Sequence, residues 1–358
     1  MTPSVASAAI AEFQATFTAV RREIAKVVIG HDRVIETILT AFFAGGHVLI
    51  EGVPGTGKTL IVRSLAEALN LSFNRIQFTV DLMPADITGT RVINEGADGR
   101  REFVFVAGPV FAHLLLADEV NRATPKTQAA LLEAMAEQQV TVAGTSYPLA
   151  PPFFVLATLN PIEMEGTYRL PEAQLDRFLF KVLLDYPSQA ELERIVGTTT
   201  SAETATVSPV LEREHAPARV EELKRLVRHV LVAPDVERYV ATLVRLTVPP
   251  AMRGGDGTSA GAGARAGRTA GASAAGEDDV ARYVAYGSSP RGGQALLLGA
   301  KVMALLDGRP HVTHADVDRG ALAALRHRIV LNFAAEAAGI DTAHVIEGVL
   351  AAARRLRP

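Results

Sequence analysis

A glycine-rich segment, residues 52–59, carries the most specific chemical pattern in the chain. It matches G-x-x-x-x-G-K-[ST] at every fixed position. In such a loop the glycines let successive N–H groups point inward around a phosphate, Lys58 reaches the β- and γ-phosphates, and the Thr59 hydroxyl binds Mg²⁺. The residues predicted to bind a nucleotide here are Gly52, Val53, Pro54, Gly55, Thr56, Gly57, Lys58, Thr59 and Leu60.

Two adjacent carboxylates, Asp118 and Glu119, form the second candidate site. They follow the apolar run 114–116, which is typical of a buried parallel strand, and ligands bind beyond the carboxyl ends of such strands. Asp118 suits Mg²⁺ coordination through water, and Glu119 suits orienting or deprotonating the attacking water. Apolar strands that end in acids are common, so the pair gains its meaning from the complete phosphate loop upstream. The predicted metal ligands are Thr59 and Asp118.

Three further side chains could complete a phosphoryl-transfer site. Asn160 ends another apolar strand, where its amide could position water against the γ-phosphate, although Asn is also a common turn residue. Taken alone, Arg177 and Arg291 are most simply explained as surface ion pairs worth roughly 0–1 kcal/mol each. Only resemblance to a known family implies that these two arginines stabilise the charge that develops on the γ-phosphate.

The elements that must position these groups follow from apolar periodicity. Residues 47–50 predict a strand and residues 60–69 a helix, which is the strand–turn–helix context that the phosphate loop requires. The alternation of strands and helices indicates an α/β core with a parallel sheet. The other predicted core strands are residues 75–79, 114–116, 153–158 and 178–184.

Two β-hairpins are predicted between core strands. The first has β-like segments at 92–93 and 103–106, and the second spans residues 139–149. The first hairpin looks like an insertion. Packing against the core and projection into a pore or onto a partner are both consistent with its sequence.

The predicted domain organisation has four parts. An N-terminal helix covers residues 1–29, and the α/β nucleotide-binding domain covers 30–187. A linker, 188–218, leads to a helical lid domain, 219–358. Within the lid, residues 254–279 are predicted to be a disordered insertion, because a Gly/Ala/Ser/Arg run cannot bury enough apolar surface to fold.

Composition narrows the class of protein. The chain has 358 residues, 48% of them hydrophobic, a net charge of -3 and no cysteine. A sizeable core is therefore possible, whereas disulfides, thiolate metal sites and a general polyanion-binding surface are not indicated. No apolar run approaches the roughly 18 residues that span a bilayer, and the N-terminus lacks a signal-peptide pattern. We expect a cytoplasmic protein without stable membrane insertion.

Together these motifs resemble AAA+ ATPases, and closely the MoxR branch of that family. The resemblance covers nearly the whole chain and is strongest at residues 52–59, 75–90, 108–135 and 156–178. It implies a P-loop NTPase (AAA+) core with a parallel sheet and two β-hairpin insertions, shared with magnesium chelatase and MCM motors, followed by an all-α lid.

The resemblance also assigns roles to individual residues. Lys58 and Thr59 correspond to the phosphate and Mg²⁺ ligands, and Asp118 with Glu119 to the Walker B pair. Asn160 corresponds to sensor 1, Arg177 to the arginine finger that reaches a neighbour's γ-phosphate, and Arg291 to sensor 2 on the lid. The implied catalytic residues are Glu119, Asn160, Arg177 and Arg291. Arg122 is a further candidate to face a neighbouring subunit.

The activity implied by the resemblance is Mg²⁺-dependent ATP hydrolysis, with ATP/ADP as the nucleotide, in a homo-oligomeric and usually hexameric ring. Hydrolysis would drive chaperone-like maturation or assembly of an unknown client protein, in some cases by metal-cofactor insertion, together with a von Willebrand factor A-domain protein. Val80, Arg169 and Gly292 depart from the usual family residues. None of these departures removes a chemical group.

Two other functions remain open. A nucleic-acid motor of the MCM type is disfavoured by the acidic charge balance, so no nucleic-acid partner is expected. A nucleotide-gated scaffold, in which binding rather than turnover sets the assembly state, is disfavoured because Glu119, Asn160 and Arg177 are all present.

Overall fold

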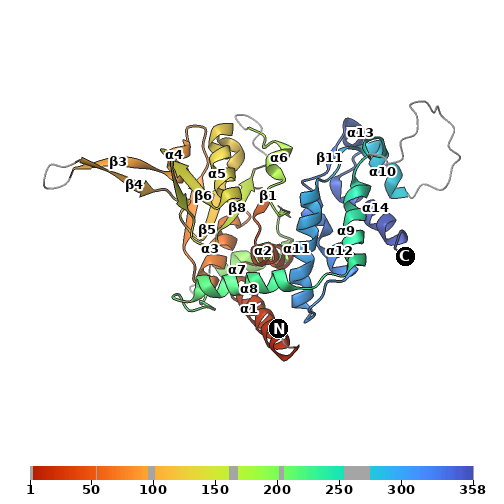
Figure 1. The fold of residues 1–358 in the computed structure, drawn as a ribbon, viewed down its shortest axis with the longest axis horizontal. Coiled ribbons are helices and arrows are strands. Elements are labelled where there is room, and N and C mark those ends of the chain that lie inside the picture. Colours follow the sequence, from red (N-terminus) through yellow and green to blue (C-terminus); the bar gives the residue numbers. More distant parts are fainter. Residues whose placement is uncertain are drawn as a thin grey trace. The chain divides into compact units, whose positions relative to one another are not determined.

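The computed structural model describes residues 3–53, 55–95, 101–160, 168–200, 205–253 and 275–357 (Figure 1). The chain forms two compact units. The first comprises residues 1–230 and 301–310, and the second comprises residues 231–300 and 311–358. Helix α8 (Ala216–His229) therefore belongs to the first unit, so the division between the units lies further along the chain than the predicted lid boundary at residue 219.

A five-stranded parallel sheet forms the centre of the first unit, with the strand order β2-β5-β8-β1-β9. The register pairs Gln77 with Asp118 and Gly52 with Leu184. The carboxyl ends of the strands therefore meet at one edge, which we call the carboxyl edge. This confirms the predicted α/β fold. The strands are β1 (Val48–Gly52), β2 (Phe73–Gln77), β5 (Leu114–Asp118), β8 (Phe154–Leu159) and β9 (Phe180–Leu184).

The central strands β5 and β8 are buried and almost entirely apolar, as is typical of parallel sheets covered by helices. The Phe42 ring of the second helix lies 5.3 Å from the Phe154 ring of β8 and so joins this helix to the sheet, and the Phe13 ring of the first helix lies 5.2 Å from that of Phe43 and joins the two helices. The long helices before and between the strands are α1 (Pro3–Ala25), α2 (Asp32–Ala44), α3 (Lys58–Leu69) and α5 (Pro125–Glu137).

Both predicted hairpins are present. The first consists of β3 (Gly89–Glu95) and β4 (Arg101–Ala107), and the second of β6 (Gln139–Val142) and β7 (Thr145–Pro148). In Figure 1 the β3–β4 hairpin projects away from the sheet. Its strands leave large apolar side chains exposed, with 65% of Phe103 and 60% of Ile93 accessible to solvent.

The base of the β3–β4 hairpin is closely packed. Gly89, which follows helix α4 (Pro84–Thr88), has φ +89°, and a Cβ there would lie 2.2 Å from the carbonyl oxygen of Val106. Only glycine fits such a position. The Phe105 ring stacks on the Tyr147 ring of the second hairpin, with 3.9 Å between centroids.

Shorter elements complete the first unit. The 3₁₀ turn η1 (Val120–Arg122) follows β5, and helix α6 (Glu172–Leu175) precedes β9. The predicted linker begins with helix α7 (Gln189–Thr199), whose first turn is capped by reciprocal hydrogen bonds between Ser188 and Glu191.

The second unit is helical, as predicted, with one short antiparallel pair of strands. Residues 254–274 of the predicted insertion lie outside the described residues, but residues 275–279 belong to a helix, so the predicted end of the insertion is wrong. No described helix is both long and apolar enough to cross a membrane. The elements are α9 (Pro234–Thr247), η2 (Pro250–Met252), α10 (Ala275–Tyr283), β10 (Val284–Tyr286), α11 (Pro290–Leu306), α12 (His314–Leu325), β11 (Val330–Leu331), α13 (Phe333–Ala337) and α14 (Thr342–Arg355). The last residues of α11, from 301 onward, belong to the first unit.

Candidate nucleotide-binding site

The glycine-rich loop lies between β1 and α3, as the motif requires. Gly55 has φ +83° and Gly57 has φ +82°, so both occupy the left-handed region that favours glycine. Helix α3 begins at Lys58, directly after Gly57. The unpaired N–H groups and partial positive charge of a helix N-terminus therefore lie at the end of the loop, which suits an anion. Pro54 lies outside the described residues.

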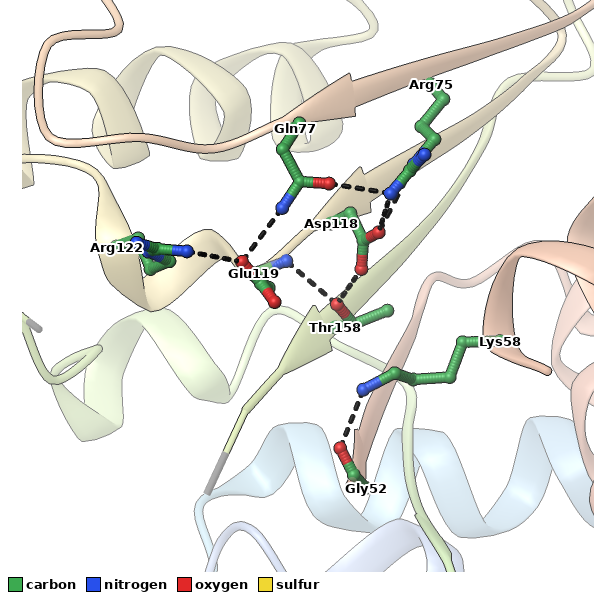
Figure 2. Close-up of polar contacts among 8 residues, drawn as sticks. All are labelled: Gly52, Lys58, Arg75, Gln77, Asp118, Glu119, Arg122 and Thr158. Carbon is green, nitrogen blue, oxygen red and sulfur yellow. Dashed lines mark hydrogen bonds and ion pairs between the residues drawn. The ribbon is translucent and has the colours of Figure 1, made fainter. Parts of the chain in front are cut away.

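Lys58 is buried beside this loop. Its Nζ donates to the carbonyl oxygen of Gly52 at 2.6 Å, and 9% of its surface is exposed (Figure 2). Burial lowers the pKa of the Lys58 ammonium, and the negative charges of Asp118 and Glu119 act in the opposite direction. A phosphate close to Nζ would add further negative charge and stabilise the charged ammonium.

Thr158 on β8 joins the two carboxylates of β5. Its Oγ1 donates to Asp118 Oδ1 at 2.6 Å and accepts a hydrogen bond from the Glu119 backbone N–H at 2.8 Å (Figure 2). Thr158 has no exposed surface. The sequence analysis did not identify this residue. Thr158 could have been noticed as a polar side chain near the end of an otherwise apolar strand, β8, which pairs with β5.

Strand β2 supplies a second set of contacts to the carboxylates. Arg75 donates to Asp118 Oδ2 from Nη2 at 2.7 Å and from Nε at 3.2 Å, and Nη2 also lies 2.7 Å from Gln77 Oε1. The Gln77 amide in turn donates to Glu119 Oε2 at 2.8 Å, and Arg122 donates to the same oxygen at 3.1 Å (Figure 2). Both Arg75 and Gln77 were missed as site residues.

Glu119 sits at a strained backbone position, with φ +58°. A left-handed conformation is uncommon for a residue other than glycine and often marks a functional site. The conformation lies where the chain leaves β5 and enters η1. It allows the Glu119 carboxylate to meet Gln77 and Arg122 while its backbone N–H meets Thr158.

The donors near the loop fit Mg²⁺. The Thr59 hydroxyl and the Asp118 carboxylate are oxygen ligands, which this hard cation prefers. Within the described ranges, His, Cys, Asp and Glu form no group of three that could hold a metal by themselves. One or two protein oxygens completed by water and phosphate are the usual arrangement for Mg²⁺ at a nucleotide.

Asn160 lies directly after β8 and is buried, with 3% of its surface exposed. Its backbone carbonyl accepts a hydrogen bond from Asn121 Nδ2 at 3.3 Å. Buried Gln128 holds the neighbouring loops, because its Nε2 lies 3.1–3.2 Å from the carbonyl oxygens of Val120, Ala123 and Tyr168. The sequence analysis did not identify Gln128.

The two predicted arginines belong to different units of the chain. Arg177 is exposed, and its Nη1 donates to the Leu132 carbonyl on α5 at 2.9 Å rather than to a residue of the phosphate loop. Arg291 is exposed on α11, in the second unit. Arg122, a candidate to face a neighbour, pairs with Glu119 of its own chain.

Comparison with known families matches two segments of the chain. Residues 47–180 match the ATPase family associated with various cellular activities (AAA), and residues 276–349 match the AAA lid domain. The first segment includes the phosphate loop, both carboxylates and Asn160. The second lies mainly in the helical second unit.

Individual relatives resemble the chain over most of its length. Chaperone MoxR1 of Mycobacterium tuberculosis is 39% identical over 333 residues, covering 92% of this chain and 79% of the relative. Protein MoxR of Methylorubrum extorquens is 32% identical over 318 residues, covering 87% and 86%. A crystal structure of a protein from Cytophaga hutchinsonii, assigned as an ATPase, superposes with a TM-score of 0.81 at 37% identity over 97% of each chain.

Proposed function

The chain belongs to the MoxR family of AAA+ ATPases, and from this premise we propose that it forms a ring in which Mg²⁺-dependent ATP hydrolysis drives maturation or assembly of a client protein. The observation that carries the proposal is the convergence of Lys58, Asp118 and Glu119 at the carboxyl edge of the sheet. Opposite charges placed beside a glycine-rich helix N-terminus suit a phosphate and its counter-ion better than a structural ion pair.

Each residue of the cluster has a defined task in this proposal. The loop and Lys58 bind and orient the β- and γ-phosphates, and Glu119 orients the attacking water and accepts its proton. Asn160 positions the same water. Thr59 and Asp118 hold Mg²⁺, which neutralises charge on the phosphate oxygens.

Arg177 is proposed to complete the site of a neighbouring subunit. It is exposed, is held by the Leu132 carbonyl, and is directed to α5 rather than to its own phosphate loop. An arginine supplied in trans can raise phosphoryl-transfer rates by roughly 10³–10⁵. Because each site would then need two chains, hydrolysis would depend on a ring, and the subunit number is proposed to be six. Arg291 is proposed to contact the nucleotide from the lid.

The role on a client protein rests on the relatives. One of them is named a chaperone, and it covers nearly all of this chain. We therefore propose a client protein, with a von Willebrand factor A-domain protein as adaptor and metal-cofactor insertion as one form of maturation.

Mixed rings test the ATPase part of the proposal. Lys58→Ala subunits should lose nucleotide binding, and Arg177→Ala subunits should bind ATP but not hydrolyse it. Mixing the two variants should restore hydrolysis, because wild-type Arg177 of one subunit can then act on the intact loop of the other. Phosphate release measured across mixing ratios should pass through a maximum. A flat, inactive series would contradict an arginine acting in trans.

The client is tested by affinity capture from native lysate. Glu119→Gln protein with ATP serves as bait, and the same protein without nucleotide serves as the control. A von Willebrand A-domain protein and a further protein retained only with ATP would support the proposal. ATP-dependent capture of nucleic acid would favour a motor, and capture independent of nucleotide would favour a scaffold.

A further inference from the structure

Asn121 makes hydrogen bonds to two residues that lie far from it in the sequence. It belongs to η1 and follows Glu119 by two positions. Its side-chain Nδ2 donates to the carbonyl oxygen of Asn160 at 3.3 Å, and its own carbonyl oxygen accepts from the Tyr168 N–H at 2.7 Å. Asn121 therefore joins the loop that follows β5 to the residue that follows β8.

A second amide, Gln128 on α5, holds the same loop. Its Nε2 lies 3.1 Å from the carbonyl oxygens of Val120 and Ala123, and 3.2 Å from that of Tyr168. Gln128 is buried, with 1% of its surface exposed. We call Asn121 and Gln128 the amide clasp. Together their NH₂ groups serve four backbone carbonyl oxygens on three separate stretches of the chain.

The amide clasp uses only its donor ends for these contacts. Because a carbonyl oxygen can only accept a hydrogen bond, an NH₂ group must face each of them. The opposite ends, Asn121 Oδ1 and Gln128 Oε1, are buried and have no hydrogen-bond partner among the described residues. A buried unpaired oxygen lowers stability, so its presence in a folded chain calls for an explanation. The explanation we favour is that the donor ends fix the loop after β5 at a required place.

We propose that Asn121 is a positioning residue for Asn160, and that Gln128 fixes the loop from which Asn121 acts. In the proposed ATPase, Glu119 and Asn160 both act on the attacking water, so their separation matters. Thr158 already holds the Glu119 backbone against β8, and Asn121 adds a contact at Asn160 itself. This inference deepens the proposed ATPase function and rests on it.

The location of the clasp predicts which kinetic quantity depends on it. Its contacts are to residues 120, 123, 160 and 168, whereas the phosphate loop is formed by residues 52–59. Loss of the clasp should therefore leave nucleotide binding intact. A displacement of about 1 Å at a reacting group can lower a rate by about 100-fold. The defect should thus appear in the turnover number.

The first test compares Asn121→Ala with Asn74→Ala. Asn74 is the matched control, because its Nδ2 also donates to a backbone carbonyl oxygen, that of Pro109, at 2.8 Å, from the early part of β2. Asn121→Ala should lower the turnover number at least about tenfold and keep the Kd of a fluorescent ADP analogue within about twofold of wild type. Asn74→Ala should keep the wild-type turnover number. Wild-type turnover in Asn121→Ala, or an equal loss in both variants, would overturn the proposal.

Asn121→Asp separates the donor from the size of the side chain, and it covers a failure of Asn121→Ala to fold. The carboxylate has nearly the same shape as the amide, but it cannot donate to the Asn160 carbonyl oxygen. The turnover number should again fall at least about tenfold. Wild-type turnover in Asn121→Asp would show that the donor is not needed and would overturn the proposal.

A double-mutant cycle tests whether Asn121 acts through Asn160. Asn160→Ala removes the amide that is proposed to orient the water. In that background, Asn121→Ala should lower the turnover number by less than about a further twofold, because no side chain is left to position. If the two losses multiplied instead, Asn121 would act independently of Asn160, and the proposal would be wrong.

Hydrogen exchange tests the clasp without ATP hydrolysis. The Tyr168 N–H donates to the Asn121 carbonyl oxygen, and the Tyr168 carbonyl oxygen accepts from Gln128. In Gln128→Met the Tyr168 amide should exchange about three- to tenfold faster than in wild type, because hydrogen bonds of ordinary strength are lost beside it. Asn74→Ala should leave this rate unchanged. An unchanged rate in Gln128→Met would overturn the clasp, whereas a wild-type protein without ATPase activity would contradict the proposed function alone.

Discussion

At the carboxyl edge of the sheet, Thr158 is fully buried and makes hydrogen bonds to two neighbouring residues, whereas Phe103 on the β3–β4 hairpin leaves 65% of its surface in solvent. The arrangement of the carboxyl edge is stabilised by hydrogen bonds between residues that are far apart in the sequence, inside an otherwise apolar sheet. The hairpin is specified by its own strand pairing and by packing at its base, including the Phe105–Tyr147 stack.

The difference separates residues whose contacts build the candidate site from residues whose side chains remain exposed to solvent. A buried polar group without its partner costs about 1–3 kcal/mol, so the edge tolerates few changes. An exposed aromatic side chain contributes little to the stability of the isolated chain. Contiguous exposed apolar surface on one element is typical of a contact region. Mutations at the carboxyl edge should therefore lower stability or ATP turnover, whereas mutations of exposed hairpin side chains should leave both nearly unchanged.

The largest expected effect is at the edge, in catalysis. Glu119→Gln should keep nucleotide affinity within about twofold and lower turnover at least about 100-fold, because the amide cannot accept a proton. Phosphate release and nucleotide titration measure the two quantities. Glu133→Gln, an exposed position on α5, is the control and should hydrolyse ATP at the wild-type rate. Near-wild-type turnover of Glu119→Gln would remove this residue from the mechanism.

The next effect concerns acid stability at the opposite end of β1. His47 accepts from the Val155 N–H through Nδ1, and burial lowers its pKa to about 4. The unfolded chain takes up this proton first, near its ordinary pKa of about 6.5. The contribution of His47 is therefore intact above pH 6.5, and the free energy of unfolding should fall by about 3 kcal/mol as the pH drops to 4. Denaturant titrations at several pH values in this range should show that the free energy of unfolding depends less steeply on pH in His47→Gln than in the wild type. An equally steep dependence would show that His47 does not cause the loss of stability in acid.

Thr158→Val should destabilise the first unit by about 1–3 kcal/mol, because Asp118 Oδ1 and the Glu119 N–H both lose their partner inside the protein. Chemical denaturation monitored by circular dichroism measures the change. Thr158→Ser keeps the hydroxyl and should recover most of the lost stability. If the Thr158→Val variant were as stable as the wild-type protein, the carboxyl edge would not depend on these hydrogen bonds, and its contrast with the hairpin would disappear.

The smallest effect should be on the hairpin. Phe103→Ser should change the free energy of unfolding by less than about 0.5 kcal/mol and leave ATP turnover unchanged. Thermal unfolding and the ATPase assay check both statements. Loss of several kcal/mol would show that this ring is part of the core, and the comparison would then need to be drawn elsewhere.

The sequence was sufficient for the parts of the site that lie within one continuous segment. The strand–loop–helix around Lys58 follows from fixed spacing, and Asp118 and Glu119 follow from an apolar strand with acids at its end. Arg75 and Thr158 could not be recognised in this way. They lie about 40 residues from Asp118, before and after it, and meet it only because the strand order places β5 between β2 and β8.

The predicted borders at α8 and α10 were wrong for two different reasons. The start of α10 was predicted to be disordered because its first residues continue the Gly/Ala-rich run. Val280 and Tyr283, a few residues later, form a buried face of this helix. Helix α8 was assigned to the lid because helices on both sides of the border have the same periodicity. Its packing against α2, which joins it to the first unit, is a tertiary contact that periodicity does not encode.

The close packing at Gly89 also has a mechanical consequence. A strand of seven residues is about 23 Å long, so a rotation of about 10° at the base moves the far end of the described strands by about 4 Å. Gln77 precedes Gly89 by only the short segment that contains α4. The base of the hairpin lies close along the chain to the carboxyl edge, so any rotation at the base would be amplified at the far end of the described strands. A small angular change there becomes a stroke of about one residue's length in an extended polypeptide.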